Sequence, residues 1–270
     1  MKIFITGATG FIGGALVKFY SGHEIYCYRR GENISERLNF FKPNFIINSA
    51  AEIYNAEKMW DSNVLLTKDC LDYQKENSNV GMIQIGSSSE YGRMDRPTRE
   101  TDPVSITNMY SSTKGIASLL CQTYGSVYKS DVVVMRTYSP YGPGERPHRL
   151  FPNLWRSFKL NNPMTMVNGV HDFCYIDDFV NAIDIVINSP GRKPGEILNV
   201  SNGCQYTNYE VLKIFQKVTG SMGNVELVDK FVTQPIWQCD NTIIKIRYGW
   251  LPQYDLEKGI AKFLEQAHYE

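Results

Sequence analysis

The chain has 270 residues, of which 28 are Lys or Arg and 28 are Asp or Glu, so its formal net charge is zero. This length suffices for one large domain or two with a buried core, and a hydrophobic content of 43% is ordinary for a globular protein. A chain without net charge gives no electrostatic reason to expect nucleic acid or an anionic membrane as a partner.

Short apolar runs alternate with helical stretches along the first half of the chain. Apolar residues recur at helical spacing over 11–19, and further helices are predicted over 56–77 and 108–128. Strands are predicted over 2–6, 24–28, 44–48, 81–85 and 131–136. This alternation predicts βαβ units, and therefore an α/β fold with a doubly wound parallel sheet of the Rossmann type.

The pattern changes after Tyr138. Proline and glycine cluster in SPYGPGERP (139–147), and helical stretches at 178–188 and 207–218 follow with a few short strands. We expect a smaller C-terminal lobe over the carboxyl edge of the sheet, where ligands of such sheets bind. The predicted division is a dinucleotide-binding domain over 1–138 and a substrate-binding lobe over 139–270, with part of 173–200 returning to the sheet.

Cysteine and histidine show no metal-binding pattern. The six cysteines include no C-x-x-C pair, and the four histidines include no H-E-x-x-H. We therefore expect reduced thiols, a cytoplasmic location and no metal. The uncharged segment 3–17 contains four glycines and is shorter than the ~20 apolar residues of a membrane span, which favours a strand, a turn and a helix over a secretory signal.

The first predicted strand runs into TGATGFIG (6–13), which has glycines at 7, 10 and 13. Glycines between a strand and a helix allow a tight turn and leave the helix N–H groups open to a pyrophosphate, which is typical of dinucleotide binding. Arg29 and Arg30 end the second strand, where an NAD site usually has an acidic residue for the ribose 2′-hydroxyl. Because arginine suits a 2′-phosphate, NADP is the predicted cofactor and NAD stays possible.

A tyrosine and a lysine four residues apart lie one helical turn apart on one face. The chain contains four such pairs: Tyr54/Lys58, Tyr110/Lys114, Tyr209/Lys213 and Tyr254/Lys258. Of these four tyrosines, only Tyr110 comes shortly after a predicted buried strand that ends in a serine, Ser87. A strand followed by a helix in this order predicts that Ser87, Tyr110 and Lys114 meet at the carboxyl edge of the sheet. A Lys⁺ would lower the pKa of the phenol from ~10 toward neutrality, and the serine would orient the reacting oxygen.

Several motifs together resemble one family. In chain order they are TGATGFIG, NSAA (48–51), SSSEYG (87–92), YSSTK (110–114), RTYSPYGPGE (136–145), HDFCYIDD (171–178) and ILNVSNG (197–203). They resemble the extended short-chain dehydrogenase/reductases that act on nucleotide sugars, the NAD-dependent epimerase/dehydratase family.

The resemblance implies a role for each matching residue. The catalytic residues would be Ser87, Tyr110 and Lys114. The residues around the cofactor would be Gly7, Gly10, Phe11, Ile12, Gly13, Arg29, Arg30, Ala50, Ala51, Tyr110 and Lys114. The residues facing the substrate would be Ser88, Ser89, Ser139, Asn153 and His171. The resemblance also implies a homodimer paired through the helices at 56–77 and 108–128.

The chain departs from the family pattern in three places. The segment from Gly31 to Pro43 is short and shows no evident acidic contact for the adenine end. His171 stands where relatives have an arginine that binds the substrate pyrophosphate, and Ser139 replaces an asparagine. The residues that could supply the missing positive charge are Arg146, Arg149, Arg156 and Lys159. His148 is a further acid/base candidate, and Glu90 is expected to be a solvated carboxylate.

The residues after Ser87 bear on the reaction. Related 4,6-dehydratases have an Asp-Glu pair there, and related 3,5-epimerising reductases have a cysteine at the position of Ser89, whereas this chain has Ser88 and Ser89. Serine does not protonate a leaving hydroxyl as a tuned carboxyl does. With dehydration and 3,5-epimerisation disfavoured, the remaining reaction is hydride transfer at the sugar C4, carried out by a 4-keto reductase or a 4-epimerase.

The predicted function is an NAD(P)-dependent oxidoreductase acting on a nucleotide sugar. The arginines at the cofactor and the resemblance of GSSSEYG to GDP-4-keto-6-deoxymannose reductases favour a reductase over an epimerase. A cofactor-binding regulator without turnover and a ketoreductase for a substrate other than a sugar are the alternatives.

Overall fold

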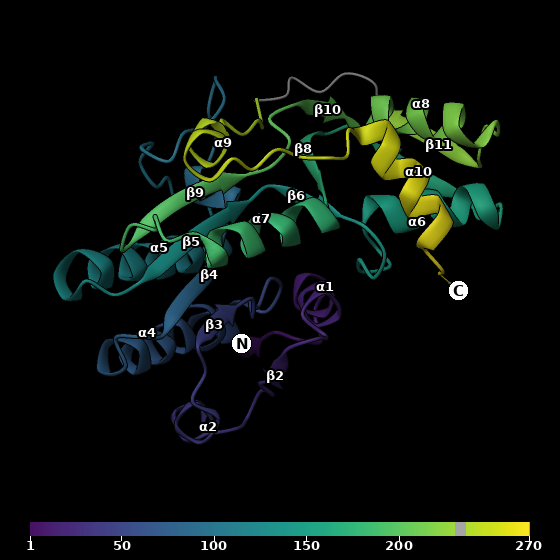
Figure 1. The fold of residues 1–270 in the computed structure, drawn as a ribbon. Helices are drawn as coiled ribbons and strands as arrows, with labels where there is room; N and C mark the ends of the chain where they lie inside the picture. The colour runs from purple at the N-terminus through teal and green to yellow at the C-terminus, as the bar shows by residue number, and fades with distance from the viewer. Residues whose placement is uncertain (230–235, 270) are drawn as a thin grey trace.

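The computed structural model describes residues 1–229 and 236–269 (Figure 1). A six-stranded sheet has the strand order β2-β1-β3-β4-β5-β9, and each neighbouring pair is parallel. Its strands are β1 (Lys2–Thr6), β2 (Glu24–Cys27), β3 (Phe45–Asn48), β4 (Gly81–Ser87), β5 (Val132–Thr137) and β9 (Glu196–Val200). The chain leaves β1 for β2 on one side and crosses back to β3 on the other. This arrangement confirms the predicted α/β class and opens a crevice beyond the carboxyl end of β1.

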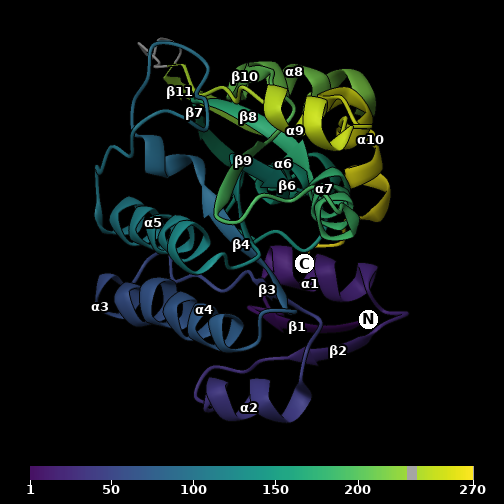
Figure 2. The same cartoon turned by 60° about the vertical axis from the view of Figure 1, so that its left-hand side comes forward.

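Side chains of the sheet alternate between two buried faces. On β1, Ile3 and Ile5 belong to one hydrophobic cluster, whereas Phe4 between them belongs to the other. The first cluster packs under α1 (Phe11–Phe19) and α7 (Ile176–Asn188), and the second packs under α2 (Ile34–Phe41), α4 (Leu66–Glu76) and α5 (Met109–Tyr128). Helices therefore cover both faces of the sheet (Figure 2), which is why its strands are apolar on both sides.

A second group of elements lies over the carboxyl edge of the sheet. Ser139, only two residues after the end of β5, begins a three-stranded sheet of order β10-β8-β6. The strands of this part are β6 (Ser139–Tyr141), β7 (Met164–Val167), β8 (Val170–Tyr175), β10 (Gln205–Thr207) and β11 (Val225–Asp229). Its helices are α6 (Leu150–Lys159), α8 (Asn208–Thr219), α9 (Thr242–Tyr248) and α10 (Leu256–Gln266). Both figures show this group stacked at one end of the sheet, with β9 returning from it to the sheet edge.

The five predicted strands of the first half are all present, with ends that differ by no more than two residues. The helix expected over 56–77 is divided into α3 (Ala56–Met59), a π-helical stretch over Trp60–Leu65, and α4. Helices α2, α6, α9 and α10 were missed. In α6, Pro152 hides the helical pattern, although proline fits the first turn of a helix because no backbone N–H is needed there. No helix within the described ranges is long and apolar enough to cross a membrane.

Candidate active site

The glycine turn after β1 is built for a close approach of backbone. Gly7 has φ +69°, and a Cβ there would lie 2.7 Å from the backbone nitrogen of Ala50. A Cβ on Gly13 would lie 2.0 Å from the carbonyl oxygen of Gly7. Helix α1 starts directly after Gly10 with no side-chain cap, so the N–H groups of its first turn stay open. Such a turn fits a dinucleotide pyrophosphate, because its donors face outward and no side chain covers them.

A cavity of about 1000 Å³ opens at this turn. The predicted cofactor residues on its lining are Gly7, Gly10, Phe11, Arg29, Arg30, Ala50 and Ala51. Ile12, Gly13, Tyr110 and Lys114 are not on the lining. Ile12 packs against the hydrophobic core, Gly13 is buried against the turn, and Lys114 is buried against Ile85 of β4. The cavity therefore runs from the glycine turn to the end of β2, as an extended dinucleotide requires.

The end of this cavity near β2 does contain an acidic residue, which the sequence interpretation did not identify. Glu32 lines the cavity and accepts hydrogen bonds from the Arg29 backbone N–H at 2.8 Å and the Tyr26 hydroxyl at 3.0 Å. Its carboxylate also pairs with Arg37 at 3.1 Å, and the Arg29 hydrogen bond is the largest cause that lowers its pKa. The turn after β2 places the Glu32 side chain next to the end of that strand. The position of Glu32 in the sequence alone does not predict this contact.

The predicted catalytic residues meet at the end of β4. Ser87 is the last residue of this strand, and Tyr110 and Lys114 lie one turn apart near the start of α5, whose first turn is capped by Asn108. The Ser87 hydroxyl lies close enough to the Tyr110 phenol to lower its pKa, and within the described structure it hydrogen-bonds Ser89. The Lys114 ammonium is buried and donates to the carbonyl of Ile85 on the same strand.

Burial dominates the electrostatics of this group. Burial raises the pKa of Tyr110, while the nearby Ser87 hydroxyl lowers it, and the net direction is upward. Burial also lowers the pKa of Lys114. The expectation that Lys114 would bring the phenol toward neutrality is therefore not met in this structure, because both groups lose solvation on burial and the ammonium is bonded to a carbonyl oxygen. The phenol is in its protonated form at neutral pH.

The other three Tyr-x-x-x-Lys pairs lie in different surroundings. The Lys213 ammonium stacks over the ring of Tyr209, whose side chain is exposed at the start of α8. The Tyr254 hydroxyl accepts a hydrogen bond from Lys262 rather than from Lys258. The Tyr54 hydroxyl hydrogen-bonds His148 at 2.7 Å. The position in the fold therefore distinguishes the Tyr110/Lys114 pair of α5 from the three other pairs, which have the same sequence spacing.

Glu90 is not the solvated carboxylate that the sequence suggested. It is fully buried and pairs with the buried Arg136 of β5 at 2.8 Å between Oε2 and Nε. Its Oε1 accepts the Ser87 backbone N–H at 2.7 Å, and the Ser87 side chain accepts the Ser89 backbone N–H in return. This capping arrangement holds the turn that carries Ser87, so Glu90 acts as a support beneath the site.

The predicted substrate residues are divided between two neighbouring places. Ser88 is buried, and the Ser89 hydroxyl lies 2.8 Å from that of Ser87. Ser139 and His171 line a second cavity of about 310 Å³, in which their side chains hydrogen-bond at 3.3 Å. Asn153 is not on that lining and accepts a hydrogen bond from Arg156 within α6. Sequence reasoning missed Tyr54 and Glu145 on the lining: Tyr54 belongs to none of the family's motifs, and Glu145 ends the motif RTYSPYGPGE without a role assigned to it.

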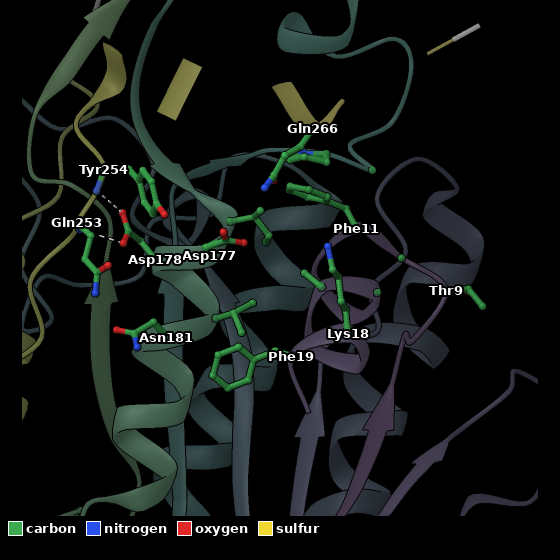
Figure 3. Close-up of a pocket in the computed structure, with 17 residues that line it drawn as sticks. Thr9, Phe11, Lys18, Phe19, Asp177, Asp178, Asn181, Gln253, Tyr254 and Gln266 are labelled. Atoms are coloured by element: carbon green, nitrogen blue, oxygen red, sulfur yellow. Dashed lines mark hydrogen bonds between the residues drawn. The ribbon is translucent and has the colours of Figure 1, made fainter. Parts of the chain in front are cut away.

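A third cavity, of about 690 Å³, lies between α1 and α7 (Figure 3). It is lined by Lys18 and Phe19 on the outer side of α1 and by Asp177 and Asn181 of α7. It shares Gly10 and Phe11 with the larger cavity, but its lining includes none of the other predicted cofactor residues that the larger cavity has, which are Gly7, Arg29, Arg30, Ala50 and Ala51. The cofactor interpretation therefore rests on the larger cavity at the end of β1.

Comparisons with known proteins agree with this geometry. A model of the NAD dependent epimerase/dehydratase family matches residues 3–201. The low-salt glycan biosynthesis protein Agl12 of Haloferax volcanii is 26% identical, over 96% of this chain and 96% of its own. The crystal structure of dTDP-glucose 4,6-dehydratase from Bacillus anthracis in complex with NAD is 23% identical, with a TM-score of 0.87 over 98% of this chain and 96% of that one. RMD from Pseudomonas aeruginosa, complexed with NADPH, is 18% identical, with a TM-score of 0.83 over 98% and 97%.

Proposed function

Because the chain belongs to the NAD-dependent epimerase/dehydratase family, we propose that it is an NADPH-dependent reductase acting at C4 of a 4-keto sugar linked to a nucleotide. The observation that carries the proposal is the environment of Ser87 and Tyr110. A serine lies beside a phenol whose raised pKa keeps it protonated at neutral pH, and the two residues after Ser87 are serines rather than acids. This set supports proton donation to an oxygen but not the removal of a hydroxyl group.

The carboxyl groups in this region support the exclusion of dehydration. Glu90 is held between Arg136 and the Ser87 backbone. Glu145 lies farther along the chain and bonds Arg149 through Oε1, while its Oε2 has no solvent-accessible surface. Glu90 is therefore not free to face a sugar ring, and Glu145 lines a cavity whose lining includes none of Ser87, Tyr110 and Lys114, so neither carboxyl is placed beside the catalytic residues to protonate a leaving hydroxyl.

The proposed mechanism assigns one role to each catalytic residue. NADPH, when bound, supplies the hydride. Tyr110 holds the proton that passes from its phenol oxygen to the O4 oxygen of the sugar, and its raised pKa keeps that proton in place until O4 becomes basic. Ser87 hydrogen-bonds O4 and orients the carbonyl group. Lys114 places a positive charge below the phenol and stabilises the tyrosinate that remains.

The cofactor preference rests on the balance of charge at the end of β2. Glu32 is occupied by Arg37 and by two hydrogen bonds, and Arg30 pairs with Glu52 at 3.6 Å. The backbone of Arg29 is engaged by Glu32, but no partner of its guanidinium is seen among the described residues. A free guanidinium on the lining favours a 2′-phosphate, and hence NADPH.

A 4-epimerase is the second candidate, because Glu32 is the type of residue that holds the ribose 2′-hydroxyl of NAD. An epimerase oxidises and then reduces C4 with one bound cofactor, so it consumes none. The two candidates therefore differ in stoichiometry.

The test supplies 4-keto-6-deoxy sugars linked to UDP, GDP, CDP or dTDP together with NADPH, and follows the absorbance of the reduced nicotinamide. We expect one NADPH to be consumed for each product formed. Interconversion of C4 epimers without net NADPH consumption would replace the reductase with the epimerase. Tight NADPH binding with no turnover of any of these sugars would instead support a regulator.

A further inference from the structure

The cavity of about 310 Å³ meets the solvent at a small set of side chains. Most of its lining is buried or half-buried, including the stacked rings of Tyr141 and Phe151, whose centroids are 4.0 Å apart. Of the lining residues, Tyr54, His148 and Arg149 are the exposed ones. These three side chains therefore form the mouth of the cavity, where a ligand from solution enters.

Two of the three mouth residues contact each other. The Tyr54 hydroxyl is hydrogen-bonded to Nε2 of His148 at 2.7 Å, and the two rings meet edge to face with their centroids 5.6 Å apart. Tyr54 belongs to the segment between β3 and α3, whereas His148 belongs to the loop that leads into α6. The contact therefore connects the Rossmann-type sheet with the C-terminal group of elements, across the mouth of the cavity.

The backbone that carries Tyr54 is held firmly. The Glu52 carboxylate accepts hydrogen bonds from the backbone N–H groups of Ile53, Tyr54 and Asn55 at 3.1, 3.2 and 3.3 Å. The side chain of the buried Asn63 in turn accepts the Glu52 backbone N–H at 2.8 Å and donates to the Glu52 carbonyl at 3.0 Å. Because the turn is fixed in this way, the part that is free to move is the Tyr54 side chain, which is 58% exposed.

A cation holds the Tyr54 ring from a second direction. The Arg146 guanidinium lies 5.1 Å from the centre of this ring, within the range of a cation–π contact. Arg146 comes from the same loop as His148, two residues earlier in the chain. The loop before α6 therefore contacts both the hydroxyl and the ring of one tyrosine.

We propose that Tyr54 and His148 form a latch across the mouth of the cavity, which is closed in this structure and opens when the Tyr54 side chain rotates away from His148. A hydrogen bond of this kind favours the closed state by a factor of about 2 to 10, and the ring contacts add to it. The latch is therefore closed most of the time and opens by thermal motion. The inference goes beyond the proposed function, because it concerns access to the cavity and holds for whichever ligand the cavity admits.

The test places a reporter thiol behind the mouth. Ser139→Cys puts it at a lining position that is 7% exposed, and its alkylation by iodoacetamide is followed by mass spectrometry. Adding Tyr54→Phe removes the hydroxyl and should raise the alkylation rate of this thiol by about 2- to 10-fold. Adding His148→Leu should have the same effect, and both changes together should do no more than either one alone, because they remove one shared hydrogen bond.

Three native cysteines and one matched variant control the measurement. Cys27 and Cys204 are exposed and report the activity of the reagent, whereas Cys174 of β8 is buried beside the strand that carries position 139 and should stay unreactive. Tyr209→Phe removes the hydroxyl of another exposed tyrosine, at the start of α8, and should leave the alkylation rate at position 139 unchanged.

Two results would overturn the inference. One is an equal alkylation rate at position 139 with and without Tyr54→Phe and His148→Leu. The other is a rise in that rate that Cys174 shares, because this would indicate a general loosening of the C-terminal elements. Alkylation requires no turnover, so its result is separate from the NADPH consumption assay that tests the proposed function.

Discussion

Replacing Glu90 with glutamine should destabilise the protein by about 3–5 kcal/mol, because it leaves a charged arginine in the interior without its counter-ion. Glu90 is 0% exposed and Arg136 is 1% exposed, and their side chains meet at 2.8 Å. The guanidinium also lies 4.4 Å from the centre of the Tyr91 ring, and its Nη1 is buried without a hydrogen-bond partner in the described structure. Glu100 lies within electrostatic reach of Arg136, but among the described residues only Glu90 forms an ion pair with it, so the lost charge is not replaced by another direct partner.

The measurements are urea denaturation and thermal unfolding of the wild type and of Glu90→Gln at pH 7, both followed by circular dichroism. At about 2–4 °C per kcal/mol for a large domain, the melting temperature should fall by roughly 10 °C. The matched control is Glu257→Gln, which breaks the exposed ion pair with Lys217 at 2.7 Å and should cost less than about 1 kcal/mol. A double variant, Glu90→Gln with Arg136→Met, should recover much of the loss, because it removes the unpaired charge as well.

Glu90→Gln should nevertheless keep the turn that carries Ser87, since the amide oxygen of glutamine is able to accept the Ser87 backbone N–H that Oε1 accepts in the wild type. The folded variant should therefore bind NADPH at low temperature. A stability loss no greater than that of the Glu257→Gln control would refute the role assigned to the ion pair. Loss of turnover at full stability would instead indicate that Glu90 takes part in the chemistry.

Four shorter predictions concern the site and the assembly. Tyr110→Phe should lower turnover by about 10²–10⁴-fold with NADPH binding retained, whereas Tyr209→Phe should be as active as the wild type in the same assay. Replacing Arg29 and Arg30 with serine should weaken NADPH binding by roughly 10- to 100-fold and leave NADH binding unchanged in fluorescence titrations. Because the pKa of His171 is lowered to about 4, the folded state is fully stable with respect to this group above about pH 6.5 and loses about 3 kcal/mol as the pH falls to 4. The His171→Gln variant should not show this pH-dependent loss when urea midpoints at pH 7 and pH 4 are compared. Light scattering should give twice the mass of the chain if the family's pairing through α4 and α5 holds, and a monomer at micromolar concentration would count against it.

The order of elements was predictable because it depends on local pattern. Apolar runs such as the one at 131–136 identify strands buried on both faces, and the glycines of 6–13 mark the turn where β1 ends. In a doubly wound parallel sheet, the carboxyl ends of β1 and β4 lie at the same edge. Ser87 is the last residue of β4 and Tyr110 lies at the start of α5, so the topology of the fold brings both to that edge. Spacing alone did not distinguish Tyr110 from three other tyrosines.

The charge state of each group was not predictable in the same way, because it depends on contacts between distant residues. Glu90 looks like a solvated residue beside a strand end, yet β5 places Arg136 directly against it. Lys114 has the sequence position of a partner for Tyr110, yet the loss of water around both groups outweighs their proximity. Desolvation depends on how the folded chain packs around a group, so no sequence periodicity predicts it.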